Sequence, residues 1–217
     1  MINRIYNIIR KDLITDMRGK LGFVSSLLYL VSVIFVIYKV FGEISGPVRI
    51  GLFWVIILFT AINIVSHSFS FHSQRRKPIY YQLYKAEELI TAKLILNFIK
   101  VFFAGILLLV LQYVLSETFI KNIELFIFGF MLATLGIVAI LTLVSSIASY
   151  SQNQTGLVSI LSLPLLIPIL LLAMRLSLIS DRMFMDTATN SYLLMLSGID
   201  ILLITLVIIF FPVIWKS

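Results

Sequence analysis

The sequence predicts an all-α integral membrane protein with six transmembrane helices, and two observations support that fold class. The first is composition: 60% of the 217 residues are hydrophobic, 12% are charged, and the mean hydropathy is +1.08. So few polar side chains cannot cover a water-exposed surface. The second is a series of apolar runs of about 20 residues, the length that crosses ~30 Å of hydrocarbon. They lie near residues 21–41, 50–69, 94–115, 123–147, 155–174 and 198–215. We expect them to form one domain over residues 1–217.

Residues 1–20 predict an amphipathic entry helix on the membrane surface, ahead of the first span. Cations such as Arg10 and Lys11 lie mostly away from its apolar face. That face can lie in the headgroup layer while the cations meet anionic lipid. No small-x-small cleavage site follows, so we expect this end of the chain to be retained. The apolar residues recur three or four positions apart, at Ile2, Ile5, Tyr6, Ile9, Leu13 and Met17.

The distribution of Lys and Arg predicts that both termini are cytoplasmic. Residues 1–20 hold five of these cations, residues 69–93 hold five more, and Lys216 lies near the end of the chain. The opposite side of the membrane holds five, together with six acidic residues that include Asp181 and Asp200. Short loops rich in Lys and Arg stay in the cytoplasm. The net charge of +7 therefore reflects membrane orientation, and we expect no nucleic-acid partner.

The stretch from Phe69 to Lys93 is the long polar segment between two spans. Its mixture of cations and aromatic residues is typical of the cytoplasmic face of a bilayer. The residues that give it this character are Arg75, Arg76, Lys77, Tyr80, Tyr81, Tyr84, Lys85 and Lys93. We expect a partner protein to dock here.

The fifth span contains two prolines, Pro164 and Pro168. Each removes a backbone donor and crowds the preceding turn, so we expect this helix to be kinked or broken. A kink can act as a gate or can be fixed packing geometry, and the sequence leaves both open. In the fourth span, Gly129 and Ala133 form a small-xxx-small pair, which favours close packing within the chain over a dimer contact.

A few polar residues inside the spans have two possible roles. Lys100 lies about two turns into the third span, where an unpaired cation is costly. It can snorkel to the cytoplasmic interface or line a substrate or proton path. His67 and His72 do not share a helix face, and no Cys or carboxylate joins them, so we expect no metal site. Ser197 and Asp200 have the spacing of a capping box that opens the last helix.

No sequence pattern for catalysis is present. The chain lacks a phosphate-binding loop, a dinucleotide-binding glycine motif, a zinc-protease motif and a nucleophile elbow. Its lack of cysteine excludes disulfides, thiol catalysis and covalent haem attachment. We therefore expect a chain with no catalytic residues and no bound cofactor of its own. The absence of an internal charge ladder favours a protein powered from outside its own chain over an ion-driven transporter.

Two groups of residues make the chain similar to known permeases. The first is Tyr80-Tyr81-x-Leu83, followed by Ala92-Lys93 and Asn97. The second is Leu163-Pro164-Leu165-x-x-Pro168 in the fifth span. With an amphipathic helix, two spans, a charged aromatic loop and four more spans, the chain resembles the ABC-2 type permeases. It resembles most closely the haem exporter protein B family of cytochrome c maturation, over nearly its whole length.

The resemblance implies a permease subunit of the bacterial inner membrane with an ABC-2 architecture like that of type V exporters. The expected partners are a cytoplasmic ABC ATPase, a haem-handling membrane subunit and a second copy of the permease. Haem is the possible cargo of the complex, and its ligands would belong to the partner. The fifth span and the periplasmic segment over residues 175–196 would shape the exit side. The residues that would couple to the ATPase are Lys77, Tyr80, Tyr81, Leu83, Tyr84 and Lys93.

Three alternatives remain open from the sequence. The complex can export haem, or it can use ATP to release haem already bound to a chaperone. The chain can instead be an ABC-2 permease for another cargo, such as a polysaccharide or a lipid. It can also be a membrane scaffold that transports nothing and recruits a soluble protein through residues 69–93.

Overall fold

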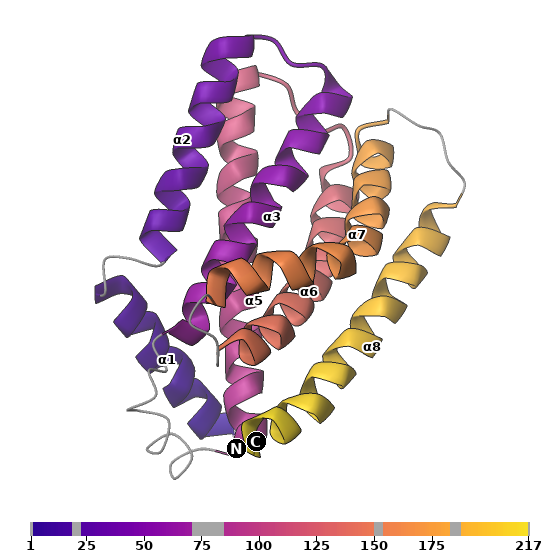
Figure 1. The fold of residues 1–217 in the computed structure, drawn as a ribbon. Coiled ribbons are helices and arrows are strands. Elements are labelled where there is room, and N and C mark those ends of the chain that lie inside the picture. Colours follow the sequence, from indigo (N-terminus) through magenta and orange to yellow (C-terminus); the bar gives the residue numbers. More distant parts are fainter. Residues whose placement is uncertain (1, 19–22, 71–84, 150–153, 183–187, 217) are drawn as a thin grey trace.

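A computed structural model describes residues 2–18, 23–70, 85–149, 154–182 and 188–216. Its helical elements are shown in Figure 1, and the described residues contain no strand. The helices are α1 (Ile2–Arg18), α2 (Phe23–Phe41), α3 (Gly46–Ser70), α5 (Ala86–Ser116), α6 (Ile123–Ala148), α7 (Gln154–Ser180) and α8 (Thr189–Lys216). Six of them, α2 to α8, are long and apolar enough to cross a membrane, which confirms the predicted fold class.

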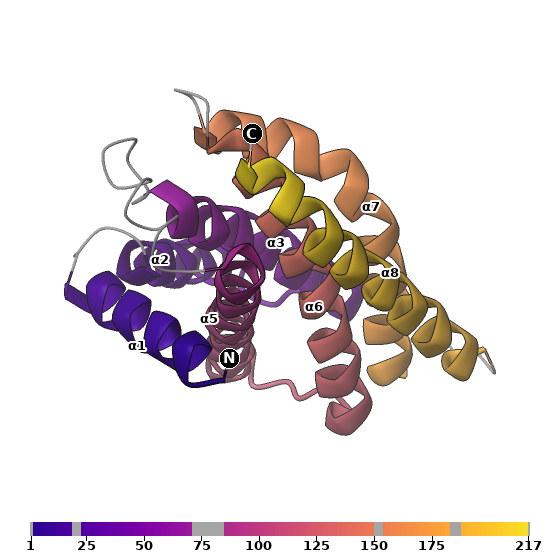
Figure 2. The same cartoon turned by 90° about the horizontal axis from the view of Figure 1, so that it is seen from below.

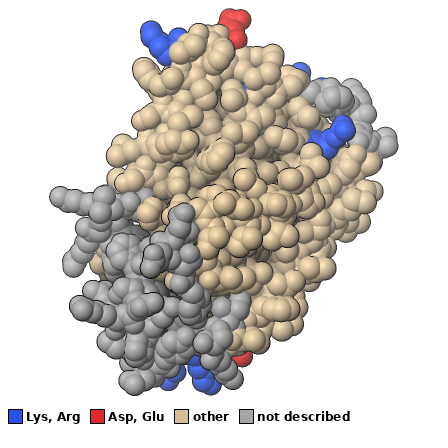
Figure 3. All heavy atoms as spheres, in the orientation of Figure 1, with Lys and Arg blue, Asp and Glu red and all other residues tan. Residues whose placement is uncertain are grey.

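Helix α6 lies at the centre of the bundle, because it packs against α3, α5, α7 and α8. Figure 2 shows α1 and α2 on one side of the molecule and α7 and α8 on the other, with α5 and α6 between them. The start of α1 and the end of α8 lie at the same end of the bundle (Figure 1). In the space-filling view of Figure 3, charged side chains lie near the ends of the molecule, and uncharged atoms cover the middle of that face.

Small residues of α5 and α6 allow the close helix contacts of this core. Gly105 of α5 faces the ring of Phe130, and a Cβ at that position would overlap the ring. Gly129 of α6 faces Leu176 of α7, and a Cβ added at Gly129 would make ordinary van der Waals contact with the leucine side chain. Ala133 is fully buried one turn later. The small-xxx-small pair therefore serves packing within the chain, as expected.

The helices that extend furthest beyond the apolar runs that predict them are α5, α7 and α8. Helix α5 begins at Ala86, well before residue 94, because Glu87 and Glu88 of its first turn can stay helical outside the hydrocarbon. Helix α7 continues to Ser180, and α8 begins at Thr189. Much of residues 175–196 is therefore helical.

The predicted capping box in the last helix is wrong. Ser197 and Asp200 both lie inside α8, and the Ser197 hydroxyl donates to the carbonyl oxygen of Leu194. An apolar run of about 20 residues marks only the part of a helix within the bilayer. Asp200 lies on a buried face of α8. Its charge next to an apolar run led to the wrong prediction that the helix starts there.

The amphipathic helix α1 packs against the bundle with part of its predicted stripe, because Ile5 and Ile9 pack against the same buried cluster as Ile8. Ile8 is 1% exposed and joins a cluster with Leu89 and Ile90 of α5. Tyr6 and Leu13, which the sequence assigned to the apolar stripe, are exposed. Apolar side chains of α1 therefore divide between the protein and the surface that a headgroup layer can cover.

Candidate coupling junction

The first turns of α5 place polar side chains on the buried face of that helix. Lys93, Asn97 and Lys100 recur at three- and four-residue spacing, so they share one side of α5. All three are buried. The Asn97 side-chain amide donates to the Thr142 hydroxyl of α6 over 3.3 Å. Buried polar groups need such partners, since an unpaired one costs free energy comparable to a lost hydrogen bond.

Lys93 joins three helices at one end of the bundle. Its Nζ lies 2.8 Å from Oδ2 of Asp12 in α1, and it donates to the carbonyl oxygen of Ser68 in α3 over 2.6 Å. The same ammonium lies 5.6 Å from the ring centroid of Phe69, a cation–π contact. Lys93 is 3% exposed. We call Asp12, Ser68, Phe69 and Lys93 the coupling junction.

The cations around Asp12 favour its ionised form. Burial by itself would raise the pKa of Asp12, but the ammonium groups of Lys93 and Lys11 outweigh it and hold the pKa below its ordinary value of 3.8. Lys11 Nζ lies 3.3 Å from the other carboxylate oxygen. An ionised Asp12 therefore holds α1 against the start of α5.

The depressed pKa predicts how α1 docking depends on pH. A carboxyl with a lowered pKa in the folded state contributes stability above its unfolded value and loses it as the pH falls through the folded value. We expect α1 to stay docked at neutral pH and to loosen only below about pH 4. Hydrogen exchange of α1 amides, measured against Asp12→Asn, checks this. Loosening near pH 6 in the wild type would contradict it.

A second contact between α1 and α5 is weaker. Arg4 lies 3.8 Å from Glu88, and the Arg4 side chain is 61% exposed. Water screens such a pair, so it contributes little. The coupling junction is therefore the main polar attachment of α1 among the described residues.

The coupling junction lies at the two helix ends that flank the predicted docking loop. Ser68 and Phe69 end α3, Lys93 lies in the early turns of α5, and the segment between them contains the predicted docking loop. Five predicted coupling residues, Lys77, Tyr80, Tyr81, Leu83 and Tyr84, lie outside the described residues. The sixth, Lys93, does not lie on an exposed loop: its ammonium is buried and already engaged. The coupling junction joins the two helices on either side of this segment, α3 and α5, to α1.

The remaining sequence candidates divide clearly. Lys100 is 6% exposed, so it is part of the buried polar face of α5. His67 is exposed at the end of α3, and His72 lies outside the described residues. In the part of the chain that the structure describes, no group of three or more His, Cys, Asp or Glu residues could hold a metal ion. Both Pro164 and Pro168 lie inside α7, which changes direction along its length (Figure 1).

The sequence did not predict a second buried ion pair, at the opposite end of the bundle. Arg49 of α3 lies 2.9 Å from Oδ2 of Asp181, just after α7. Arg49 also donates to the hydroxyl and carbonyl oxygens of Thr118. The backbone N–H of Lys121 donates to the other oxygen of Asp181 over 3.4 Å. This outer cluster of Arg49, Thr118, Lys121 and Asp181 ties α3 and α7 to the connection between α5 and α6.

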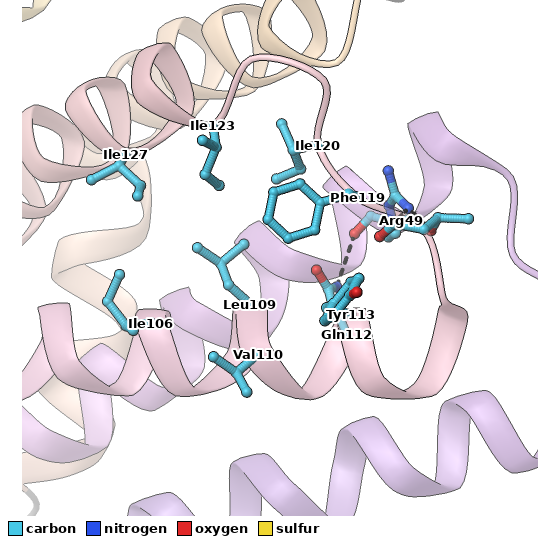
Figure 4. Close-up of a pocket in the computed structure, with 11 residues that line it drawn as sticks. Arg49, Ile106, Leu109, Val110, Gln112, Tyr113, Phe119, Ile120, Ile123 and Ile127 are labelled. Carbon is cyan, nitrogen blue, oxygen red and sulfur yellow. Dashed lines mark hydrogen bonds between the residues drawn. The ribbon is translucent and has the colours of Figure 1, made fainter.

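A cavity of about 190 Å³ lies beside the outer cluster. Figure 4 shows the Phe119 ring, Leu109 and Ile123 around it, with Gln112 donating to the Arg49 carbonyl oxygen at its rim. Its walls come from α5, α6 and the connection between them, and they are mostly apolar. None of the residues that line it is a His, Cys, Met, Asp or Glu.

A family model described as "CcmB protein" matches residues 3–213. A search of curated proteins finds no match.

Proposed function

The chain belongs to the CcmB family, and from this premise we propose how a partner ATPase drives this membrane subunit. The family and the six apolar helices identify a multi-pass protein of the inner membrane, a permease subunit of an ABC transporter in haem export and cytochrome c biogenesis. In the proposal, a cytoplasmic ATPase docks on the segment between α3 and α5, and its ATP-driven motion passes through the coupling junction to α1.

The coupling junction is the observation that carries this proposal. A docking loop can transmit work only if the elements on both sides of it move together with the rest of the permease. Lys93 links the end of α3, the start of α5 and α1 through one buried ammonium. Residues 69–93 would then be a cytoplasmic coupling segment, with both termini on the same side.

The remaining parts of the proposal follow from the family. Two copies of the permease would work with the ATPase and with a haem-handling membrane subunit that supplies the haem ligands. The bent α7, with Pro164 and Pro168, would shape the exit side together with the outer segment over residues 175–196. The complex would either export haem or release a haem-loaded chaperone.

A pull-down from the native membrane in mild detergent tests the proposal. We expect to recover an ABC ATPase and a haem-binding membrane protein, with recovery that changes on addition of ATP. An ATPase without haem proteins would indicate another ABC cargo. ATP-insensitive recovery of a soluble partner without any ATPase would indicate a scaffold.

Charge reversal in the docking segment gives a sharper test. We expect the triple change Arg75→Glu, Arg76→Glu and Lys77→Glu to lower ATPase recovery by about tenfold or more, because reversed charges oppose the partner surface. The matched control reverses an exposed cation at the other end of the bundle, Lys39→Glu in the last turn of α2, and should leave recovery unchanged. Equal recovery from the triple variant and the control would refute docking at this segment.

A further inference from the structure

Asp200 of α8 is a buried carboxylate without a partner. It is 3% exposed, and neither of its oxygens has a hydrogen bond. None of the ion pairs between described residues includes it. Asp181 is equally buried but has Arg49 and the N–H of Lys121 as partners. The state of Asp200 therefore needs a different explanation.

The carboxylate lies deep between three membrane-spanning helices. A Cβ added to Gly136 of α6 would lie 2.5 Å from Oδ1 of Asp200 and 2.8 Å from Cδ1 of Ile169 in α7. Gly136 is near the middle of α6, about 20 Å from the start of that helix at 1.5 Å per residue. Asp200 and Ile169 therefore occupy the space that a side chain at position 136 would need, so α8 and α7 both approach α6 closely at this glycine.

Charged residues on the neighbouring helices do not compensate Asp200. In α6 the charged residue is Glu124, in the first turn. Arg175 of α7 is exposed and lies about 9 Å along the helix from Ile169. In α5, Glu87 and Glu88 lie in the first turn and Lys93 is bound to Asp12. Lys100 of the same helix is not a hydrogen-bond partner of either Asp200 oxygen.

An ionised carboxylate in this position would be costly. Water is absent from the hydrocarbon core, and a charge there is tolerated only with a counter-charge, coordination or access to water. The neutral carboxylic acid avoids that cost and gains an O–H donor. Ser177, Ser180 and Thr205 of this chain already donate to the carbonyl oxygen four residues earlier in their own helices. The O–H of a neutral Asp200 can use a backbone carbonyl oxygen as its acceptor in the same way.

We propose that Asp200 is a proton-binding site in the interface between α8 and α6. Helix α8 packs around the neutral acid. When the interface opens to water, the O–H bond breaks, the proton passes to water and the negative charge stays on the carboxylate. Movement of α8 away from α6 is thereby linked to proton release, independently of where the ATPase docks.

A single cysteine reports the packing of α8, because the chain contains no cysteine. Leu196→Cys places a thiol at a fully buried position of α8. The full-length protein in lipid nanodiscs is labelled with a maleimide between about pH 6 and about pH 9, with and without Asp200→Asn. The ratio of the two rates at each pH cancels the ionisation of the thiol itself. Ala61→Cys, buried in α3, is the matched reporter away from α8.

For the Leu196→Cys reporter, we divide the labelling rate measured with Asp200 intact by the rate measured with Asp200→Asn. This ratio should rise by about tenfold across the pH range, since each unit of pH changes the ionised fraction of Asp200 by up to tenfold. The ratio at the Ala61→Cys reporter should stay constant. A constant ratio at Leu196→Cys would overturn the proposal.

Infrared spectra of the wild-type protein give a second readout that needs no variant. A protonated carboxylic acid band that shifts on ¹³C labelling of aspartate is expected at neutral pH, and its absence would equally overturn the proposal.

Discussion

Replacement of Lys93 by Met should release α1 from the bundle and cost about 3 kcal/mol of local stability, because it leaves Asp12 buried without its main counter-charge. The ammonium also provides the hydrogen bond to Ser68 and the contact with Phe69. Hydrogen exchange of α1 amides measures local opening directly, and a cost of this size corresponds to about 100-fold faster exchange.

The paired variant separates the ion pair from general packing. Asp12→Asn with Lys93→Met removes both charges, so its cost should be smaller than the sum of the two single changes by about 1–3 kcal/mol. Lys85→Met is the matched control, since Lys85 is exposed just before α5. Exchange in α1 that is the same for Lys93→Met and Lys85→Met would show that the coupling junction does not hold α1.

The same variant distinguishes docking from transmission in the proposed mechanism. The Lys93 ammonium is buried, so Lys93→Met should leave recovery of the ATPase unchanged. Cytochrome c maturation should nevertheless fall, because the motion of the docked segment no longer reaches α1. Loss of ATPase recovery in this variant would place Lys93 on the docking surface, as the sequence first suggested.

The sequence was sufficient for the six spans, because hydrophobicity over about 20 residues is a local property that the bilayer reads directly. The ends of the helices were harder to predict. Glu87 and Glu88 break the apolar run without breaking the helix, so α5 starts earlier than hydropathy indicates. Hydropathy locates the hydrocarbon, and the helix continues for as long as its backbone is paired.

The contacts of the candidate site could not be predicted, because they join residues far apart in the chain. Arg49 and Asp181 are separated by 132 positions and appeared only as two of the charges on the outer side. Asp12 lies in a helix whose cations predicted contact with anionic lipid, and no sequence pattern near Asp12 predicted its pairing with Lys93. Asp200 did carry a usable signal: an acid within a predicted span is costly, and that cost alone should have favoured a buried role over a helix cap.

Replacement of Arg49 by Met should destabilise the outer end of the bundle by about 3 kcal/mol, since it leaves Asp181 buried with only the distant N–H of Lys121. For a chain of this length that corresponds to a fall in Tm of roughly 6–12 °C. Thermal unfolding in detergent micelles checks the value. Arg175→Met is the matched control, because Arg175 is exposed on α7. Equal melting of the two variants would mean that the outer pair contributes nothing.

The two ion pairs lie at opposite ends of the spanning helices, so their effects should separate. Arg49→Met should speed hydrogen exchange in the connection between α5 and α6, which Thr118 and Lys121 attach to the outer cluster. It should leave α1 protected, whereas Lys93→Met should do the reverse. Sites this far apart without shared partners add nearly independently. Exchange in α1 that responds to Arg49→Met would instead reveal coupling along α3, the helix that carries both Arg49 and Ser68.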